Sequence, residues 1–573
     1  MWKCVVLILC TCAILVQSDE DWRLVNISQG PLRGRMDPEG GLYNFYNIPY
    51  ATAPTGSDRY KAPLPPPVWL SPFDAVDRGI VCPQPSEPLL FRIMTENCLV
   101  ANVFVPDSVE TNLLPVLVNV HGGGYQIGDG LYGQFKDLVR TKKVIVVSFN
   151  YRLGVHGFLC LGTEGAPGNA GIKDQVAALR WINKNIASFG GNPEDVTLSG
   201  CSAGSGSIDI LTLSSITTGL FKKAIMESGV STGYAGLVID PIENAKTYAK
   251  LLNFNDVDDL NSLEEFYKTA SYEQLLSRSD VMISAGNSTI LFGPCIERDI
   301  GQERVIKDAP INVMQQGNYT KIPLLYGFTN MDGALVLSFF ETWKDQMNEK
   351  FSDFLPAELY FVSEDVKEEV TQRVKKLYFG DDPVSEDNIL SFIKYYTDVS
   401  FAYPMLRSLS TRVDALGDTI YLFEYRFVDE DTPSFPHTDV RGADHCSQLY
   451  AVMDEDVTDR TEEYKQMKHI MRDYWHNFIL TGSPSSSDSV LPSWPPANAE
   501  RAPHMSLGGV IELKEDILED SVALWDDIYE KHYRGPVLPA STDDNDPDSD
   551  GAVSLVLSNV MLATVLISFY FTL

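Results

Sequence analysis

The sequence has 573 residues, of which 44% are hydrophobic and 11% aromatic, and its formal net charge at pH 7 is -33. A chain of this length and apolar content can bury a large core, which excludes a disordered or repetitive protein. The negative charge excludes nucleic acid as a partner, because phosphate backbones attract Lys and Arg rather than carboxylates. We interpret it as a solvated acidic surface that keeps the protein soluble.

Residues 1–18 have the pattern of a secretory signal peptide. Lys3 precedes an apolar run that ends at Val16 and is too short to span a bilayer. Val16 and Ser18 are small enough for the positions before a cleavage site, and an acidic stretch follows them. We therefore expect cleavage after Ser18 and entry into the secretory pathway.

Secretion gives meaning to three Asn-X-Ser/Thr sequences, which begin at Asn26, Asn287 and Asn318. Each of them alone is a weak signal, because such tripeptides are common by chance. We expect two of the three to be glycosylated.

Six cysteines remain once the signal peptide is removed, and none of them has metal-binding spacing. A secreted protein can hold disulfides, and Cys82 and Cys98 would close a short loop, so we predict a bridge between them. For the other four cysteines, buried free thiols are favoured, and bridges remain an alternative. These four are Cys160, Cys201, Cys295 and Cys446.

Short apolar runs alternate with helical patterns along the middle of the chain, which indicates buried strands of a mostly parallel sheet. The expected strands are 116–120, 144–149, 196–198, 223–226, 322–326 and 419–423. The stretch 171–189 has apolar residues on a helical period and predicts an intervening helix. We expect one large α/β domain over residues 19–535.

A Gly-X-Ser-X-Gly sequence, 200–204, follows the expected strand 196–198 and precedes a segment rich in small residues. The pentapeptide alone is a weak signal. Between a strand and a helix, however, its glycines permit the sharp turn that exposes a nucleophilic serine, here Ser202.

A second glycine-rich turn, His121-Gly122-Gly123-Gly124, follows the expected strand 116–120. A serine nucleophile needs a base and also donors for the oxyanion of the tetrahedral intermediate. We predict that the amides of Gly123, Gly124 and Ala203 form this oxyanion hole.

The C-terminal residues 551–573 form an apolar tail without Lys or Arg, preceded by an acidic, Pro- and Ser-rich stalk over 536–550. A stop-transfer helix normally has basic residues on its cytoplasmic side. The tail therefore favours a glycosylphosphatidylinositol signal, with attachment near Ser549, Asp550 or Gly551. A retained membrane span and simple secretion stay open as alternatives. We expect an extracellular protein anchored to the outer cell surface.

The chain resembles the type B carboxylesterase and cholinesterase family over nearly its whole mature length. The motifs that carry the resemblance are Asn150-Tyr151-Arg152, Gly157-Phe158-Leu159, Pro167-Gly168-Asn169, Asp174-Gln175, Phe189-Gly190-Gly191-Asn192-Pro193, Ile48-Pro49-Tyr50-Ala51, Gly56, Arg59 and Glu96-Asn97-Cys98-Leu99. The resemblance implies an α/β-hydrolase fold, hydrolysis of small-molecule carboxylic esters and no cofactor or metal. It also implies two structural ion pairs, Arg59 with Glu96 and Arg152 with Asp174.

The family's triad runs in the order serine, acid, histidine. Its acid motif matches residues 327–333 and assigns the acid to Asp332, where glutamate is more common. Its C-terminal motif, Gly-Ala-Asp-His-Cys here, assigns the base to His445. The resemblance thus implies a triad of Ser202, Asp332 and His445.

Three departures from cholinesterases bear on the substrate. Cys201 stands where cholinesterases have glutamate, and the loop from Cys82 to Cys98 has no tryptophan to hold a quaternary ammonium group. Leu335 and Val336 match positions that are aromatic in cholinesterases, which indicates an aliphatic pocket. We expect aliphatic or xenobiotic esters rather than choline esters.

Insect esterases that degrade odorants, pheromones, hormones or foreign esters are the nearest group in overall appearance. Juvenile hormone esterases are expected to be less similar, because they usually have glutamine where Cys201 stands. The alternative function is that of a catalytically silent adhesion protein, since some cell-surface relatives lack triad members.

Overall fold

The computed structural model describes residues 21–85, 92–108, 112–233, 236–278, 283–284, 289–454, 458–486, 492–515 and 517–539. The predicted signal peptide, Asn287, the tail and most of the stalk lie outside the described residues. No helix of the described part is long and apolar enough to cross a membrane.

A 13-stranded sheet runs through the molecule in the order β1-β2-β3-β7-β9-β8-β10-β11-β14-β15-β16-β17, with β4 paired to β2. Pairing is parallel from β9 to β16 and antiparallel at both ends. Its strands are β1 Trp22–Ile27, β2 Gly30–Met36, β3 Leu42–Pro49, β4 Phe73–Asp74, β7 Val100–Pro106, β8 Leu114–Val120, β9 Ile145–Phe149, β10 Gly191–Cys201, β11 Lys223–Glu227, β14 Leu324–Thr329, β15 Ile420–Tyr425, β16 His504–Leu507 and β17 Ile511–Lys514. Two short ribbons add β5 Ile80–Val81 with β6 Ile93–Met94, and β12 Ile283–Ser284 with β13 Thr289–Ile290.

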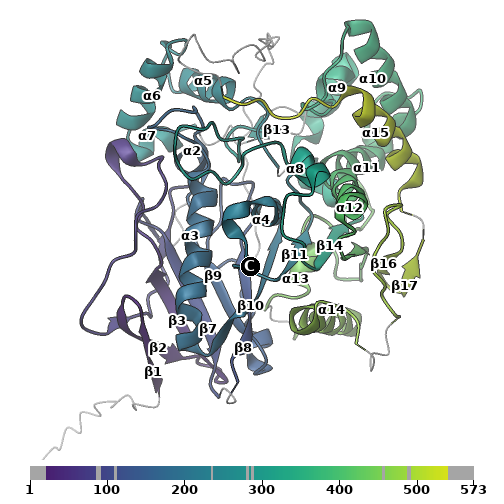
Figure 1. The fold of residues 1–573 in the computed structure, drawn as a ribbon. Helices are drawn as coiled ribbons and strands as arrows, with labels where there is room; N and C mark the ends of the chain where they lie inside the picture. The colour runs from purple at the N-terminus through teal and green to yellow at the C-terminus, as the bar shows by residue number, and fades with distance from the viewer. Residues whose placement is uncertain are drawn as a thin grey trace, which may run out of the picture.

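Fifteen α-helices of the described chain surround this sheet (Figure 1). They are α1 Lys136–Arg140, α2 Gly154–Phe158, α3 Ala170–Asn185, α4 Ala203–Leu213, α5 Pro241–Leu251, α6 Leu260–Thr269, α7 Tyr272–Leu276, α8 Pro310–Gln316, α9 Phe340–Lys350, α10 Glu364–Phe379, α11 Ile389–Thr397, α12 Tyr403–Leu416, α13 Ser447–Tyr450, α14 Glu462–Thr481 and α15 Glu519–His532.

Alternation of side chains along the central strands builds a core on each face of the sheet. In β8, Val116 and Val118 belong to the core shared with α3, α4 and α12, while Leu117 belongs to the core shared with α1 and α14. In β11, Met226 belongs to the first of these cores and Ile225 to the second. Because successive side chains of a strand point to opposite faces, strands covered on both faces read as continuous apolar runs.

The predicted mostly parallel α/β sheet is confirmed, and the six predicted strands correspond to β8, β9, β10, β11, β14 and β15. The strand expected at 196–198 is longer, since β10 begins at Gly191 and ends at Cys201. The helix expected at 171–189 is α3 followed by a 3-10 turn, Ile186–Phe189.

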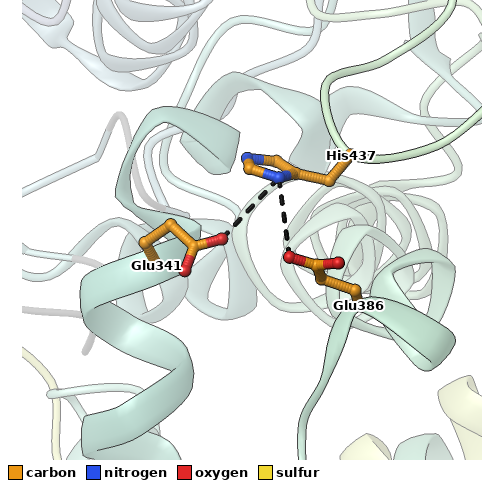
Figure 2. A group of neighbouring side chains, drawn as sticks. All are labelled: Glu341, Glu386 and His437. Atoms are coloured by element: carbon orange, nitrogen blue, oxygen red, sulfur yellow. Dashed lines mark ion pairs between the residues drawn. The ribbon is translucent and has the colours of Figure 1, made fainter.

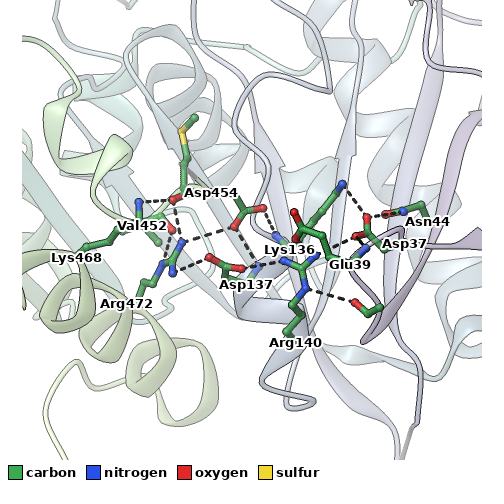
Figure 3. Close-up of polar contacts among 12 residues, drawn as sticks. Asp37, Glu39, Asn44, Lys136, Asp137, Arg140, Val452, Asp454, Lys468 and Arg472 are labelled. Atoms are coloured by element: carbon green, nitrogen blue, oxygen red, sulfur yellow. Dashed lines mark hydrogen bonds and ion pairs between the residues drawn. The ribbon is translucent and has the colours of Figure 1, made fainter. Parts of the chain in front are cut away.

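A polar network ties α1 to α14 and to the hairpin between β2 and β3 (Figure 3). Asp454 accepts the amides of Lys136 and Asp137 at 2.6 and 3.0 Å and so caps α1. Arg472 of α14 contacts Asp137 at 2.9 Å and donates to the carbonyls of Val452 and Met453, both at 2.9 Å. The segment 451–454 is thus held between two helices.

Candidate active site

Ser202 lies at the turn between β10 and α4, at the carboxyl end of a central parallel strand. Its φ is +59° and its ψ is -128°, a conformation that non-glycine residues rarely adopt. The amide of Ser202 donates to the carbonyl of Glu227 at 2.9 Å. A Cβ at Gly204 would lie 2.2 Å from the carbonyl oxygen of Val120. Strain of this kind is found at functional turns, where the surroundings hold it in place.

Asp332 and His445, which are 113 residues apart, are in contact. The Nδ1 of His445 lies 2.8 Å from Oδ1 of Asp332. The other carboxylate oxygen of Asp332 accepts the amide of Thr329 at 2.9 Å and the hydroxyl of Ser228 at 3.1 Å. The Asp332 side chain is completely buried, and that of His445 is 12% exposed. A carboxylate bound to Nδ1 fixes the tautomer in which Nε2 accepts a proton.

The glycine-rich loop that follows β8 lies against the serine turn. A Cβ at Gly122 would lie 2.7 Å from the carbonyl oxygen of Cys201 and 3.3 Å from Cβ of Ser202. Gly123 and Gly124 have φ values of +103° and +59°, in the left-handed region that favours glycine. The amide of Ala203 has no acceptor within its own helix, because Ala203 begins α4. The assignment of these amides to an oxyanion hole stays a prediction.

The pKa of Glu227, at the end of β11, is raised from its ordinary 4.5 to about 8. Burial is the largest cause of this shift, Trp475 opposes it, and the negative charge of Asp332 adds to it. Burial also lowers the pKa of His121, whose ring stacks on Tyr151 with a centroid distance of 4.3 Å. Glu227 and His121 therefore both favour the neutral form at pH 7.

Three residues near the triad were not predicted from the sequence. Ser228 joins Asp332, and Gln448 donates to Ser228 at 2.9 Å. Phe401 packs on the ring of His445 with a centroid distance of 4.7 Å. Phe401 belongs to a π-helical turn, Asp398–Ala402, a feature that often marks functional sites. For Ser228, its place after a buried strand of the parallel sheet was an available signal.

The cysteines pair differently from the prediction. The Cys82–Cys98 disulfide is present as expected. Free thiols were favoured for the other four cysteines, and this is wrong, because the structure contains Cys160–Cys295 and Cys201–Cys446 bridges. Their partners are 135 and 245 residues apart, so only the fold brings them together.

The remaining predicted residues can also be placed. Arg59 pairs with Glu96 at 3.2 Å, and Arg152 pairs with Asp174 at 2.6 Å, as the family resemblance implied. Two of the glycosylation sites, Asn26 and Asn318, are exposed, and their glycosylation stays a prediction.

Within the described chain, one group of three side chains has the spacing of metal ligands: Glu341, Glu386 and His437 (Figure 2). The Nδ1 of His437 lies 3.7 Å from Glu341 and 3.9 Å from Glu386. All three are exposed, and Lys344 donates to Glu341 at 2.8 Å. The ammonium group of Lys344 therefore already supplies a positive charge beside these side chains, and we assign no metal to them.

Comparison with known proteins agrees with the fold. Residues 21–525 match the family model described as "Carboxylesterase family". A crystal structure of juvenile hormone esterase from Manduca sexta, with OTFP covalently attached, superposes with a TM-score of 0.79 at 28% identity, over 89% of this chain and 100% of that one. Fold and site together define an α/β-hydrolase esterase. The chain belongs to the carboxylesterase family, and it is a carboxylic-ester hydrolase.

Relatives at about 30% identity come from insects and bacteria. Juvenile hormone esterase of Heliothis virescens is 30% identical over 88% of this chain and 94% of its own length. Para-nitrobenzyl esterase of Bacillus subtilis (strain 168) is 32% identical over 86% of this chain and 96% of its own length. Juvenile hormone esterases are thus among the similar proteins. The expectation that Cys201 makes them less similar to this chain is not confirmed.

Proposed function

We propose that this carboxylic-ester hydrolase is a serine esterase that works through an acyl-enzyme on Ser202. The observation that carries the proposal is the 2.8 Å contact between His445 and the buried Asp332, on an edge of the sheet that also bears the strained serine turn. Ser202, Asp332 and His445 are all retained, which favours an enzyme over the adhesion alternative.

The reaction proceeds in two stages. The Oγ of Ser202 attacks the ester carbonyl carbon while Nε2 of His445 takes the hydroxyl proton. The oxyanion is stabilised by the amides of Gly123, Gly124 and Ala203, and its collapse expels the alcohol, which takes the proton from His445. Water then attacks the acyl carbon with His445 again as the base. The bond between this carbon and Oγ of Ser202 breaks, Oγ takes the proton from His445, and the carboxylic acid leaves. Asp332 orients the imidazole and stabilises its charged form.

The favoured substrates are aliphatic or xenobiotic esters. Leu335 and Val336 follow Asp332 in the 3-10 segment Asp332–Phe339, and neither side chain offers an aromatic face for a quaternary ammonium group. Similar proteins named for foreign esters include the para-nitrobenzyl esterase above and pyrethroid hydrolase Ces2a of Mus musculus, 30% identical over 86% of this chain. An aliphatic lining favours apolar acyl groups through the area that they bury.

The proposed location is the outer cell surface. The signal-peptide pattern of 1–18, the three Asn-X-Ser/Thr sequences and the apolar tail over 551–573 support it. Disulfides persist in oxidising compartments, and the described chain contains three.

Replacement of the nucleophile tests the mechanism. We expect Ser202→Ala to lower kcat for p-nitrophenyl esters at least about ten-thousandfold and to abolish labelling by an organophosphate, because no hydroxyl remains to be acylated. Asp332→Asn should cost about as much by disturbing the imidazole tautomer. Ser199→Ala, on the same strand, is the matched control and should retain activity. Activity of Ser202→Ala within tenfold of wild type would exclude the proposed role.

A chain-length series tests the substrate proposal. We expect kcat/KM for p-nitrophenyl esters to rise from acetate to butyrate and hexanoate, by up to about threefold to fourfold for each buried CH₂. Acetylthiocholine should be a poor substrate next to an uncharged thioester of equal length. A preference for the choline ester would contradict the aliphatic pocket.

A further inference from the structure

The Cys201–Cys446 disulfide joins the two residues that directly flank the proposed nucleophile and base. Cys201 is the last residue of β10 and precedes Ser202, whereas Cys446 follows His445 and precedes α13. Their Cα atoms are 6.1 Å apart although 245 residues separate them in the chain. In the sequence these positions read only as Cys-Ser and His-Cys.

The backbone is strained on both sides of this bridge. Ser202 has a φ of +59° and Cys446 a φ of +65°, both in the left-handed region. Non-glycine residues stay in that region only where surrounding contacts over-determine their conformation. The disulfide connects the two strained turns covalently, so each turn restrains the other.

Hydrogen bonds close a ring that starts and ends at the disulfide. The Nε2 of Gln448 lies 3.8 Å from Sγ of Cys201 and donates to the hydroxyl of Ser228 at 2.9 Å. Ser228 donates in turn to Asp332. The ring therefore runs through Cys201, Cys446, His445, Asp332, Ser228 and Gln448.

We propose that the Cys201–Cys446 disulfide is a positioning element of the triad, which holds the His445 turn at a fixed place beside the Ser202 turn. The inference rests on the proposed catalytic roles of Ser202 and His445. The hydrogen bonds of the ring orient the imidazole, and the disulfide prevents its backbone from moving away from the nucleophile. Displacement of a catalytic group by about 1 Å can lower a rate about a hundredfold.

If the disulfide positions His445, the activity of the enzyme should be sensitive to reduction of the Cys201–Cys446 bond. A dithiol reductant transfers two electrons and two protons to the bridge, which leaves thiols at Cys201 and Cys446 and converts the reductant to its own disulfide. The other two bridges flank no triad residue, so their loss should act on stability and not on the chemical step.

The first experiment compares two double variants of the full-length chain. We expect Cys201→Ala with Cys446→Ala to lower kcat for p-nitrophenyl butyrate between about tenfold and about a hundredfold, with KM changed by less than about threefold. The rate of organophosphate labelling at Ser202 should fall in parallel. The control, Cys160→Ala with Cys295→Ala, should keep kcat within twofold even if its melting temperature falls. A kcat of the first variant within twofold of wild type would overturn the proposal.

The second experiment serves if the first variant does not fold. Folded wild-type enzyme is treated with rising dithiothreitol until alkylation and mass spectrometry detect thiols at Cys201 and Cys446. Loss of activity that follows the opening of this bond, and returns on reoxidation, supports the proposal. Full activity with the bond open overturns it. Ser202→Ala in the same assay tests the proposed function separately. If this variant retained activity, the proposed triad itself would be excluded.

Discussion

Glu227 is a buried acid beside the serine turn, paired across the sheet with Cys201 and bonded through its carbonyl to the amide of Ser202. Its raised pKa, about 8, lies above the ordinary 4.5. Between these two values the unfolded chain has lost the proton while the folded protein keeps it. The stability that Glu227 contributes is therefore fully present below pH 4.5 and is lost as pH rises through about 8.

Glu227→Gln should remove this pH dependence, because the amide is neutral at every pH. We expect the free energy of unfolding of the variant to rise relative to wild type by roughly 1 kcal/mol per pH unit between pH 5 and 8. Urea unfolding at several pH values measures it. Glu194→Gln, at an exposed position, is the control. Parallel curves for Glu227→Gln and wild type would show that Glu227 ionises normally.

At the scale of single residues, the sequence assigned the proposed triad but not the side chains that contact it. Ser202 was assigned from its turn motif, and Asp332 and His445 were assigned from the family resemblance. Ser228 had one available signal, its place after a buried strand. Gln448 and Phe401 have no local signature, because an isolated glutamine or phenylalanine acquires its role only through a partner distant in the chain.

Among the elements, α14 packs its apolar face into the core on one side of the sheet, and charged side chains also join it to α1 and to the segment 451–454. Arg472 bridges Asp137 and the carbonyls of Val452 and Met453, and its side chain is 20% exposed. Removing it leaves the carbonyl of Val452 without this donor, while Asp137 keeps Arg140 and the carbonyl of Met453 keeps Lys468. The loss of a donor to a part-buried carbonyl costs more than the loss of an exposed ion pair.

We expect Arg472→Ala to lower the free energy of unfolding by about 2 kcal/mol. Arg180→Ala is the matched control, since Arg180 pairs with Glu303 in solvent and both side chains are about half exposed. The control should change stability by less than about 1 kcal/mol. Urea midpoints monitored by tryptophan fluorescence distinguish the two variants. Equal losses would mean that the network of Figure 3 adds no more than surface charge.

Strands could be predicted better than pairings. Buried strands of a parallel sheet appear as apolar runs, so β8 and β11 were located almost to the residue. β10 was predicted too short, because its first half carries polar residues such as Asn192 and Glu194. Which cysteines meet depends on the order of strands in the sheet, and the sequence does not contain that order in any local pattern.

At the scale of the whole molecule, both the sheet and a disulfide position the residues of the proposed active site. The parallel strands β8, β10, β11 and β14 bring the glycine loop, Ser202, Glu227 and the Asp332 segment to one edge. His445 comes from a long connection after β15, and no strand fixes it. A covalent link that closes a loop of 245 residues stabilises mainly by restricting the unfolded chain, on the order of 5 kcal/mol in the entropy model. His445, the proposed triad member that no strand of the described chain positions, thus has a disulfide beside it.

The proposed anchor is a property of the whole mature chain, and it can be tested on intact cells. If residues after about Ser549 are exchanged for a glycolipid, a phosphatidylinositol-specific phospholipase should release most of the esterase activity into the medium. A chain ending at residue 548 keeps the domain over 19–535 and should appear in the medium without treatment. A retained span would resist the phospholipase and keep its tail. Detection of peptides from 565–570 in the mature surface protein would therefore exclude the anchor and leave the esterase assignment intact.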